Sequence, residues 1–141
     1  LFDKLRNCSN KTLAGVAEKA LKEVAYQAQW SAEWVIRLGD GTDESHHKMQ
    51  ESINRLWMWS GELFEAHPMF DMLDDSFVRF ESLREVWLHK IGEVLKEATL
   101  VIPGPELWMQ TGGRYGIHTS ELGFILAEMQ SLARTHPEAT W

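Results

Sequence analysis

The sequence predicts an all-α fold, an antiparallel arrangement of four helices, from three observations. Small and apolar residues recur at steps of three and four along four segments, which is the spacing of a buried helical stripe. Gly and Pro separate these segments. The sequence contains no alternating apolar and polar run long enough to predict a strand. We find no internal repeat, so the helices are expected to differ from one another.

The first helix is expected from about Asn10 to about Leu38. Its core stripe consists of Leu13, Val16, Ala20, Val24, Ala28, Ser31, Val35 and Leu38. Three aromatic residues form a second stripe at i, i+4 and i+8, namely Tyr26, Trp30 and Trp34. A helix with two apolar faces is expected inside a bundle or between subunits.

A glycine-containing connection is expected to end this helix. Gly39-Asp40-Gly41 carries two residues that adopt the left-handed cap conformation easily, so we expect a positive φ at Gly39 or Gly41. Thr42 is suited to cap the next helix through its hydroxyl group. Because the connection is short, the two helices should be antiparallel neighbours.

The second helix is expected to decline at Gly61 and Pro68. Its inward residues are expected to be His46, Met49, Ile53, Leu56, Trp57 and Ser60. Residues 62–80 are less regular and predict a short helical turn or a packed loop. That stretch carries Met69, Phe70, Met72, Leu73, Phe77 and Phe80.

A third helix is expected from about Glu81 to about Thr99, followed by a break at Pro103-Gly104-Pro105. Its apolar face comprises Leu83, Val86, Trp87, Ile91, Val94 and Leu95. A loop follows at 112–116, and Thr119 is expected to cap a last helix that ends near Arg134. The inward face of that helix comprises Leu122, Ile125, Leu126, Met129 and Leu132.

Length and composition narrow the class of protein. A chain of 141 residues predicts a single domain over 1–141, and a net charge of −7 argues against binding to nucleic acid or to an anionic membrane. The single cysteine, Cys8, cannot form an internal disulfide, which predicts a cytoplasmic location. The chain starts at Leu1 with neither an initiator methionine nor a signal peptide, so we expect that an N-terminal part is absent.

A helical bundle raises the question of a di-iron site. Such sites take one Glu from each of two helices and a Glu-x-x-His pair from each of two others. Only Glu44-Ser45-His46-His47 has this spacing, so we predict no metal ligand and no cofactor in this chain. Glu44 is then expected to stabilise the helix dipole, His46 to be packed and His47 to be exposed. An alternative is that Glu33, Glu44 and His47 bind a divalent metal at the end of the helix.

Nucleophilic and phosphate chemistry have little support in the sequence. Cys8 has no histidine placed near it by the sequence and is interpreted as an incidental thiol. The loop Gly112-Gly113-Arg114-Tyr115-Gly116 lacks the preceding strand and the lysine of a P-loop. Arg114 could still meet a phosphate, although a plain loop is favoured. We therefore predict no catalytic residue and no cofactor-binding residue.

The number of tryptophans indicates a protein partner. The chain has seven, and aromatic side chains are enriched at interfaces. A single small core does not need all of Trp30, Trp34, Trp57, Trp59, Trp87 and Trp108. We therefore expect part of this set to lie at an interface with another chain.

Several blocks of the sequence together resemble those of one known family. They are Ala20-Leu21-Lys22-Glu23-Val24-Ala25-Tyr26, residues 35–46 (VIRLGDGTDESH), Arg55-Leu56-Trp57, residues 61–64 (GELF), residues 116–119 (GIHT), residues 121–130 (ELGFILAEMQ) and residues 137–141 (PEATW). In these blocks the chain resembles the PaaC subunits of phenylacetyl-CoA epoxidase complexes. The blocks occur in the family's order, cover nearly the whole chain and match only the later half of a full family member.

This resemblance implies a ferritin-like helical fold and a place in a multicomponent monooxygenase that epoxidises the aromatic ring of phenylacetyl-CoA. In that family the chemistry occurs at a di-iron centre in the related PaaA subunit, and electrons come from NADPH through a separate flavin and iron–sulfur reductase. The expected partners are thus a PaaA-type di-iron catalytic subunit and other subunits of the complex, with neither nucleic acid nor membrane. The expected role is that of a non-catalytic structural subunit. Two alternatives stay open, a di-iron oxygenase subunit in its own right and a stand-alone helical protein that binds an acyl-CoA.

Overall fold

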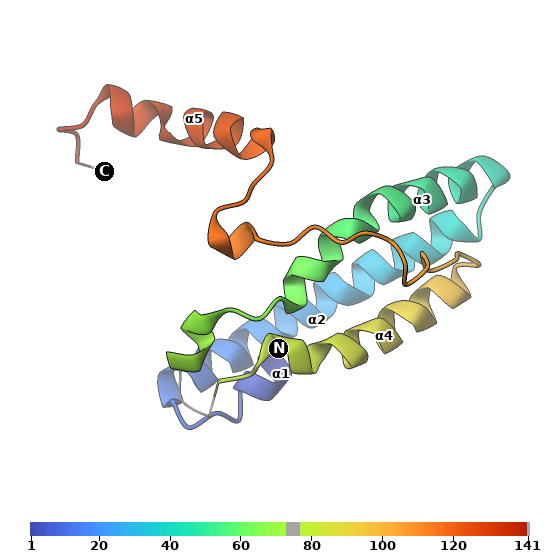
Figure 1. Cartoon of the computed structure of the whole chain (residues 1–141). Helices are drawn as coiled ribbons and strands as arrows, with labels where there is room; N and C mark the ends of the chain where they lie inside the picture. The colour runs from blue at the N-terminus through green and yellow to red at the C-terminus, as the bar shows by residue number, and fades with distance from the viewer. Residues whose placement is uncertain (73–76, 141) are drawn as a thin grey trace. The chain divides into compact units, whose positions relative to one another are not determined.

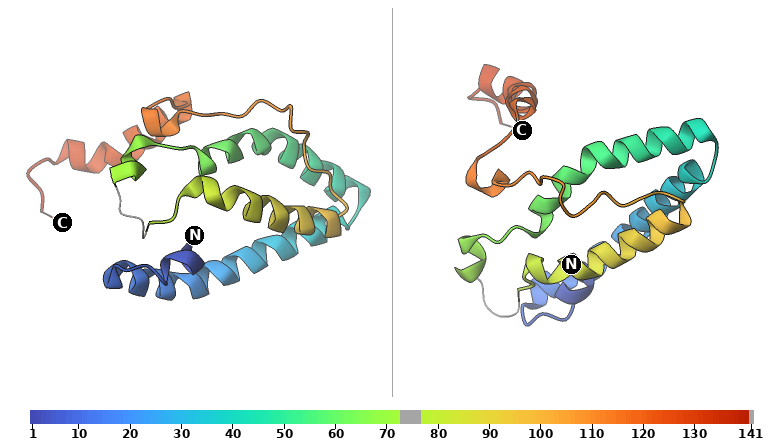
Figure 2. Two further views of the ribbon diagram at one scale, coloured as in Figure 1. Left: turned by 60° about the horizontal axis from the view of Figure 1, so that its bottom comes forward. Right: turned by 45° about the vertical axis from the view of Figure 1, so that its right-hand side comes forward.

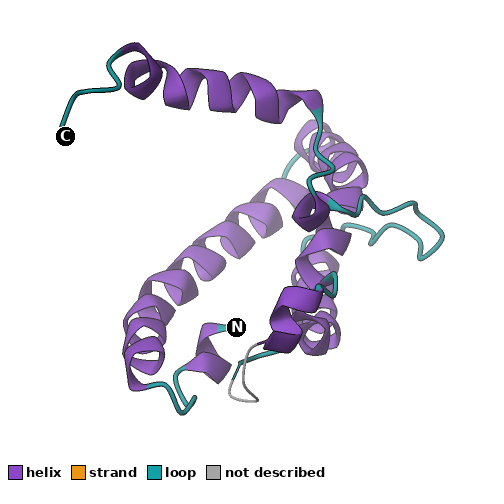
Figure 3. Ribbon diagram, turned by 60° about the vertical axis from the view of Figure 1, so that its left-hand side comes forward, coloured by secondary structure: helices purple, strands orange, loops and turns teal. Residues whose placement is uncertain are grey.

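The computed structural model describes residues 1–72 and 77–140, so Leu73 and Trp141 lie outside the described residues. The prediction of an all-α fold is confirmed, because every regular element of the described residues is helical (Figure 3). The chain divides into two compact units, Leu1–Gln110 and Thr111–Trp141. The expectation of a single ferritin-like domain over residues 1–141 stays a prediction.

The first unit contains the longer helices, coloured blue to yellow in Figure 1. Its elements are α1 (Phe2–Leu5), α2 (Lys11–Gly39), α3 (Asp43–Leu56), η1 (Trp57–Phe64), η2 (Pro68–Met72), η3 (Phe80–Leu83) and α4 (Arg84–Glu97). The second unit contains the single turn η4 (Gly113–Tyr115) and the helix α5 (Ser120–Thr135). These bounds lie close to those expected for the four helices, except that α3 ends at Leu56, so Trp57 and Ser60 lie in η1 and not on the second helix. The turn η2 falls within the stretch 62–80 expected to be irregular, and η1 and η3 overlap its two ends.

Local capping explains where α2 and α3 begin. The side chain of Asn10 accepts a hydrogen bond from the backbone N–H of Leu13 at 3.0 Å. Thr42 and Ser45 form a capping box, in which the Ser45 N–H donates to Thr42 Oγ1 at 3.2 Å and the Thr42 N–H donates to Ser45 Oγ at 2.9 Å. Each cap satisfies N–H groups that a helix start leaves without a partner. The expected cap at Thr42 is therefore confirmed.

The expected positive φ at Gly39 or Gly41 is wrong. Among the described glycines, only Gly112 and Gly116 have positive φ, at 93° and 82°. Gly39 is instead the last residue of α2, and a Cβ atom added to it would lie 2.9 Å from the Cβ of Ala98. A Cβ atom on Gly41 would lie 2.8 Å from the Arg37 carbonyl oxygen. Other residues of this chain approach both glycines so closely that a larger side chain would not fit. This close approach, and not a left-handed backbone conformation, therefore explains both glycines.

The directions of α2, α3 and α4 agree with the expected antiparallel arrangement. The antiparallel pairing of α2 and α3 is confirmed, because the two helices lie side by side and run in opposite directions (Figure 2). Beside the turn that joins them, the Ser45 hydroxyl donates to the Leu38 carbonyl oxygen at 2.7 Å. The next helix, α4, is antiparallel to α3 and therefore parallel to α2, as Figure 2 shows. The turns η1, η2 and η3 carry the chain back to the end of the unit where α2 starts, so α4 begins there. The fourth predicted helix, α5, belongs to the second unit.

A small core lies where the ends of α2 and α4 meet α3. Leu95, Ala98 and Leu100 are buried, and around them pack Val35, Ile36, Met49, Ile53, Trp57 and Ile91. Several residues expected to face inward are instead exposed, namely Val16, Val24, Ala28, Ser31, Leu38, Leu56, Val86, Ile125, Leu126, Met129 and Leu132. In the first unit α3 and α4 cover only part of α2, and the second unit contains no second α-helix among its described residues.

The end of α4 has an unusual C-cap. Thr99 has a φ of 60° although it is not glycine, and the Leu100 N–H donates to the Leu95 carbonyl oxygen at 2.8 Å. The Thr99 N–H donates to the Lys96 carbonyl oxygen at 3.2 Å. This pair of hydrogen bonds is the Schellman motif, in which glycine usually occupies the left-handed position. Leu95 and Leu100, the two residues that contact each other in such motifs, are both buried here.

Replacing Thr99 by Gly should stabilise the protein by a few tenths to about 1 kcal/mol. A β-branched residue is strained at this φ, whereas glycine is not. The gain is reduced because Thr99 Oγ1 also donates to the Gly39 carbonyl oxygen at 3.3 Å. Urea denaturation of both proteins measures the difference. A lower free energy of unfolding for Thr99→Gly would mean that the hydroxyl contact outweighs the backbone strain.

Candidate functional site

Three aromatic side chains form a line on the exposed side of α2, and we name them the α2 aromatic stripe. Tyr26, Trp30 and Trp34 are 69%, 55% and 41% exposed. The rings of Trp30 and Trp34 meet edge to face with centroids 6.2 Å apart, and the Arg37 guanidinium lies 4.8 Å from the centroid of Trp34. The stripe is thus an ordered aromatic surface with a cation at one end, chemistry that is typical of protein interfaces.

An apolar groove runs between α2, α3 and α4 in the first unit. It consists of two adjoining hollows of about 300 and 380 Å³. The two hollows share Val35, Trp87, Ile91 and Leu95. Lys90 is its one charged lining residue in the described part of the chain. The small side chains of Ala28, Ser31 and Ala32 form the α2 side of this groove.

A smaller cavity lies between η1, α4 and residues 102–109, and we name it the proline-loop cavity. Its volume is about 270 Å³. Trp57 and Trp87 separate it from the apolar groove, since both residues line both spaces. The ring centroids of these two tryptophans are 5.6 Å apart, and that of Phe64 is 5.4 Å from Trp87. Arg84, the first residue of α4, also lines the cavity.

The residues considered for metal binding have other partners. Glu44 forms an ion pair with Lys48 at 2.6 Å, and Glu33 accepts a hydrogen bond from Gln29 at 2.9 Å. His47 is exposed. Within residues 1–72 and 77–140, no three His, Cys, Asp or Glu side chains form a group that could hold a metal ion, so Glu33, Glu44 and His47 are not brought together. The prediction that this chain binds no metal and no cofactor stays a prediction.

The packed position expected for His46 is found in the structure. Its Nδ1 lies 2.7 Å from the Gly39 carbonyl oxygen and 3.4 Å from Thr99 Oγ1. A ring N–H that donates to this carbonyl oxygen joins α3 to the end of α2. Thr99 contacts the same carbonyl oxygen from the end of α4. His46 therefore takes part in holding the ends of three helices together.

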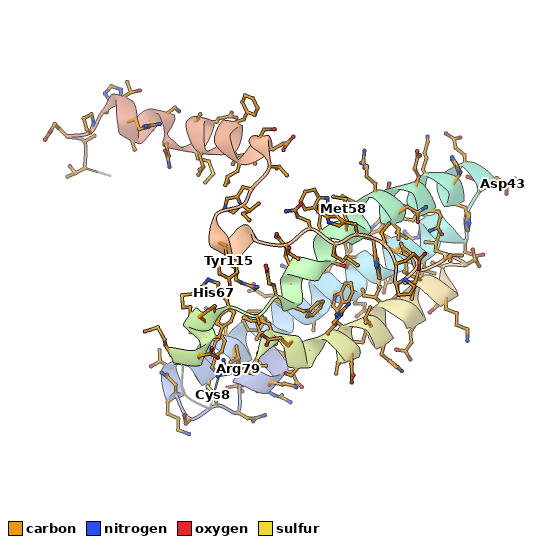
Figure 4. The ribbon with its side chains drawn as sticks, in the orientation of Figure 1. Cys8, Asp43, Met58, His67, Arg79 and Tyr115 are labelled. Atoms are coloured by element: carbon orange, nitrogen blue, oxygen red, sulfur yellow. The ribbon has the colours of Figure 1, made fainter. Side chains whose placement is uncertain are left out.

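The local structure around Cys8 and around the glycine loop at 112–116 accounts for these residues. Cys8 is buried and its thiol donates to the Asn10 carbonyl oxygen at 3.4 Å. Figure 4 shows Cys8 and Asp43 at opposite ends of the first unit. In the second unit, Gly112 and Gly116 flank η4, and their positive φ values explain the glycines of this loop.

The start of α5 differs from the expected cap. Thr119 occupies the N-cap position, but its side chain makes no capping hydrogen bond to the helix backbone. Hydrogen bonding by the Thr119 hydroxyl, together with the backbone N–H of Glu121 itself, instead lowers the pKa of the Glu121 carboxyl group below its usual value. The negative charge so favoured lies near the positive end of the helix dipole.

Sequence reasoning missed Arg84 and the proline-loop cavity. The residues Pro103-Gly104-Pro105 predict only a break after the third helix, whereas the structure makes them one wall of the cavity. The spacing of Trp57 and Trp87 along the chain contains no sign that the two rings meet.

No helix among the described residues is both long and apolar enough to cross a membrane.

Comparison with known proteins identifies the family. Residues 1–141 match the family described as "Phenylacetic acid catabolic protein". The chain is also 39% identical over 143 residues to one of the subunits of the "1,2-phenylacetyl-CoA epoxidase" of Escherichia coli (strain K12). That similarity covers 100% of this chain and 57% of the relative, so the chain spans a little over half of the relative's length. The resemblance noted in the sequence is thus confirmed, and the chain belongs to the phenylacetic acid catabolic protein family.

Proposed function

We propose that this protein is a non-catalytic structural subunit of a multicomponent monooxygenase that epoxidises the aromatic ring of phenylacetyl-CoA. The similarity to one chain of a phenylacetyl-CoA epoxidase supports the complex and the substrate. The observation that carries the structural role is the α2 aromatic stripe, because it presents three aromatic rings outward from a helix that also contributes to the core. We propose that this surface contacts a PaaA-type di-iron catalytic subunit.

The physical argument concerns the cost of leaving these rings in water. Buried aromatic side chains dominate interface energetics, and tryptophan is enriched among residues whose truncation weakens binding most. The edge-to-face contact of Trp30 with Trp34 and the guanidinium of Arg37 over Trp34 already order this surface before a partner binds. An ordered surface loses less side-chain entropy on association, which favours binding.

Co-purification and iron analysis of the separated chains test the proposed function. The full-length protein and a PaaA-type subunit are expressed together, isolated as a complex and then separated. We expect the two chains to elute together and the iron to stay with the PaaA-type chain. Stoichiometric iron in this protein, with an absorbance band of an oxo-bridged pair, would support the alternative of a di-iron oxygenase subunit in its own right. Failure of the two chains to associate would contradict the structural role.

A further inference from the structure

The proline-loop cavity has the features of a small-molecule site that the proposed function does not use. Its volume of about 270 Å³ is close to the lower end of the range for ligand pockets, roughly 300–1,000 Å³. The rings of Trp57, Phe64 and Trp87 form an aromatic wall, with the neighbouring centroids 5.4 to 5.6 Å apart. Such a wall offers edge-to-face and stacking contacts to one more ring.

Residues 102–105 and Met109 form another wall of the cavity, and the segment that carries them is held in place at both of its ends. The Gln50 side chain donates to the Val101 carbonyl oxygen at 2.9 Å and accepts from the Val101 N–H at 2.8 Å. At the other end, the Gln110 N–H donates to the Met58 carbonyl oxygen at 2.9 Å. The segment from 101 to 110 is therefore anchored to α3 and to η1. Anchored walls keep the cavity open without the cost of ordering a loop upon binding.

Close packing along η1 supports the same wall. A Cβ atom added to Gly61 would lie 2.9 Å from the Cβ of Met109, so glycine is the residue that lets these two segments approach. The rigid Pro103 and Pro105 flank Gly104 in the middle of the wall. The Glu106 carboxylate folds back over Gly104, and Glu106 is not among the residues that line the cavity.

Arg84 gives the cavity its charge. It is the one charged residue among the described residues that line the space, and no Asp or Glu among them lines it. In the part of the chain that the structure describes, its guanidinium has neither an ion pair nor a hydrogen bond, whereas Arg6 and Arg79 are paired with Asp3 and Asp71. A guanidinium offers two parallel N–H donors that match a carboxylate.

We propose that the proline-loop cavity binds a small aromatic carboxylate. The ring of the ligand lies against Trp57, Phe64 and Trp87, and its carboxylate accepts hydrogen bonds from the Arg84 guanidinium. A cavity of about 270 Å³ has room for a single ring with a short acidic substituent. The site stands independently of the proposed function, since no residue of the α2 aromatic stripe lines it.

Calorimetric titration of the full-length protein tests this site with benzoate as the probe. Benzamide is the uncharged control and cyclohexanecarboxylate is the non-aromatic control. We expect benzoate to bind more tightly than either. Arg84→Met should weaken benzoate binding about tenfold or more, because a charge-assisted bidentate contact is lost, and should leave benzamide binding unchanged. Arg84→Lys should give an intermediate loss of benzoate affinity, since lysine keeps the positive charge but lacks the two parallel N–H donors of the guanidinium.

Arg55→Met is the matched control, because it removes an exposed arginine of α3 that does not line the cavity. We expect it to leave benzoate binding unchanged, with circular dichroism showing native helix content for all three variants. Lack of benzoate binding at millimolar concentration would overturn the proposal. So would an equal loss in Arg84→Met and Arg55→Met, which would indicate general electrostatic attraction. If cyclohexanecarboxylate bound as tightly as benzoate, the proposed recognition of an aromatic ring would be overturned.

Discussion

Replacing Gly39 by Ala should lower the free energy of unfolding by about 2 kcal/mol, because the added methyl group has no room. Its Cβ atom would lie 2.9 Å from the Cβ of Ala98 and 3.0 Å from a Cδ atom of Leu100. Both residues belong to the buried core, so the end of α4 must move away and loosen the packing of Leu95. Urea denaturation should show a lower midpoint with an unchanged slope, the signature of a change in stability alone.

Gly15 provides the matched control on the same helix. A Cβ atom on Gly15 meets nothing within 4 Å, and the residue is exposed. Gly15→Ala should therefore raise stability by up to about 1 kcal/mol, the difference in helix propensity between the two residues. If Gly39→Ala were also stabilising, the close approach of α2 and α4 at Ala98 would not exist in solution.

Trp30→Ala and Trp34→Ala should each weaken association with the PaaA-type partner by about 2 kcal/mol or more, roughly 30-fold in Kd. Each substitution removes an exposed ring from the α2 aromatic stripe, so the loss arises in the complex. Stability of the isolated protein should change by less than about 1 kcal/mol, because both side chains are exposed. Trp34→Ala has the larger effect on stability, since it also loses the contact with Arg37.

The affinity for the partner and the stability of the isolated protein must both be measured to interpret the two tryptophan variants. The Kd for the partner is measured by titration, and the melting temperature by circular dichroism on the protein alone. Gln27→Ala is the control, because it changes an exposed residue of the same helix outside the stripe. If both tryptophan variants leave the Kd and the melting temperature unchanged, the rings are ordinary surface residues. If the melting temperature falls as strongly as the affinity, the rings stabilise this chain and not the interface.

Helix bounds could be predicted because they depend on neighbours within a few residues. Asn10 and Thr42 begin α2 and α3 as expected, since a cap requires only the next three residues. The aromatic stripe could also be predicted, because residues four apart share a face of any helix. Its exposure follows from the same spacing, which turns Trp30 and Trp34 away from the core side of α2.

The roles of individual glycines and of Thr99 could not be predicted in this way. The sequence predicts a left-handed conformation at Gly39 or Gly41, yet Thr99 adopts that conformation, sixty positions after Gly39, and Gly39 packs beside it. The preference of glycine for positive φ is a property of the residue alone. Whether a glycine is needed for its conformation or for its missing side chain depends on what lies against it.

The sequence by itself determined that the chain is all-α, where its helices begin and which aromatic residues line one side of α2. Only the tertiary structure decided that α5 belongs to a separate unit and that Trp57 meets Trp87. It also decided that Arg84 and the proline loop line one cavity. The physical reason is the range of the forces involved. Helix periodicity and capping act between residues within one or two turns, whereas the contacts of Trp57 with Trp87 and of Gly39 with Thr99 join residues 30 and 60 positions apart. Such contacts depend on how the whole set of apolar faces packs together.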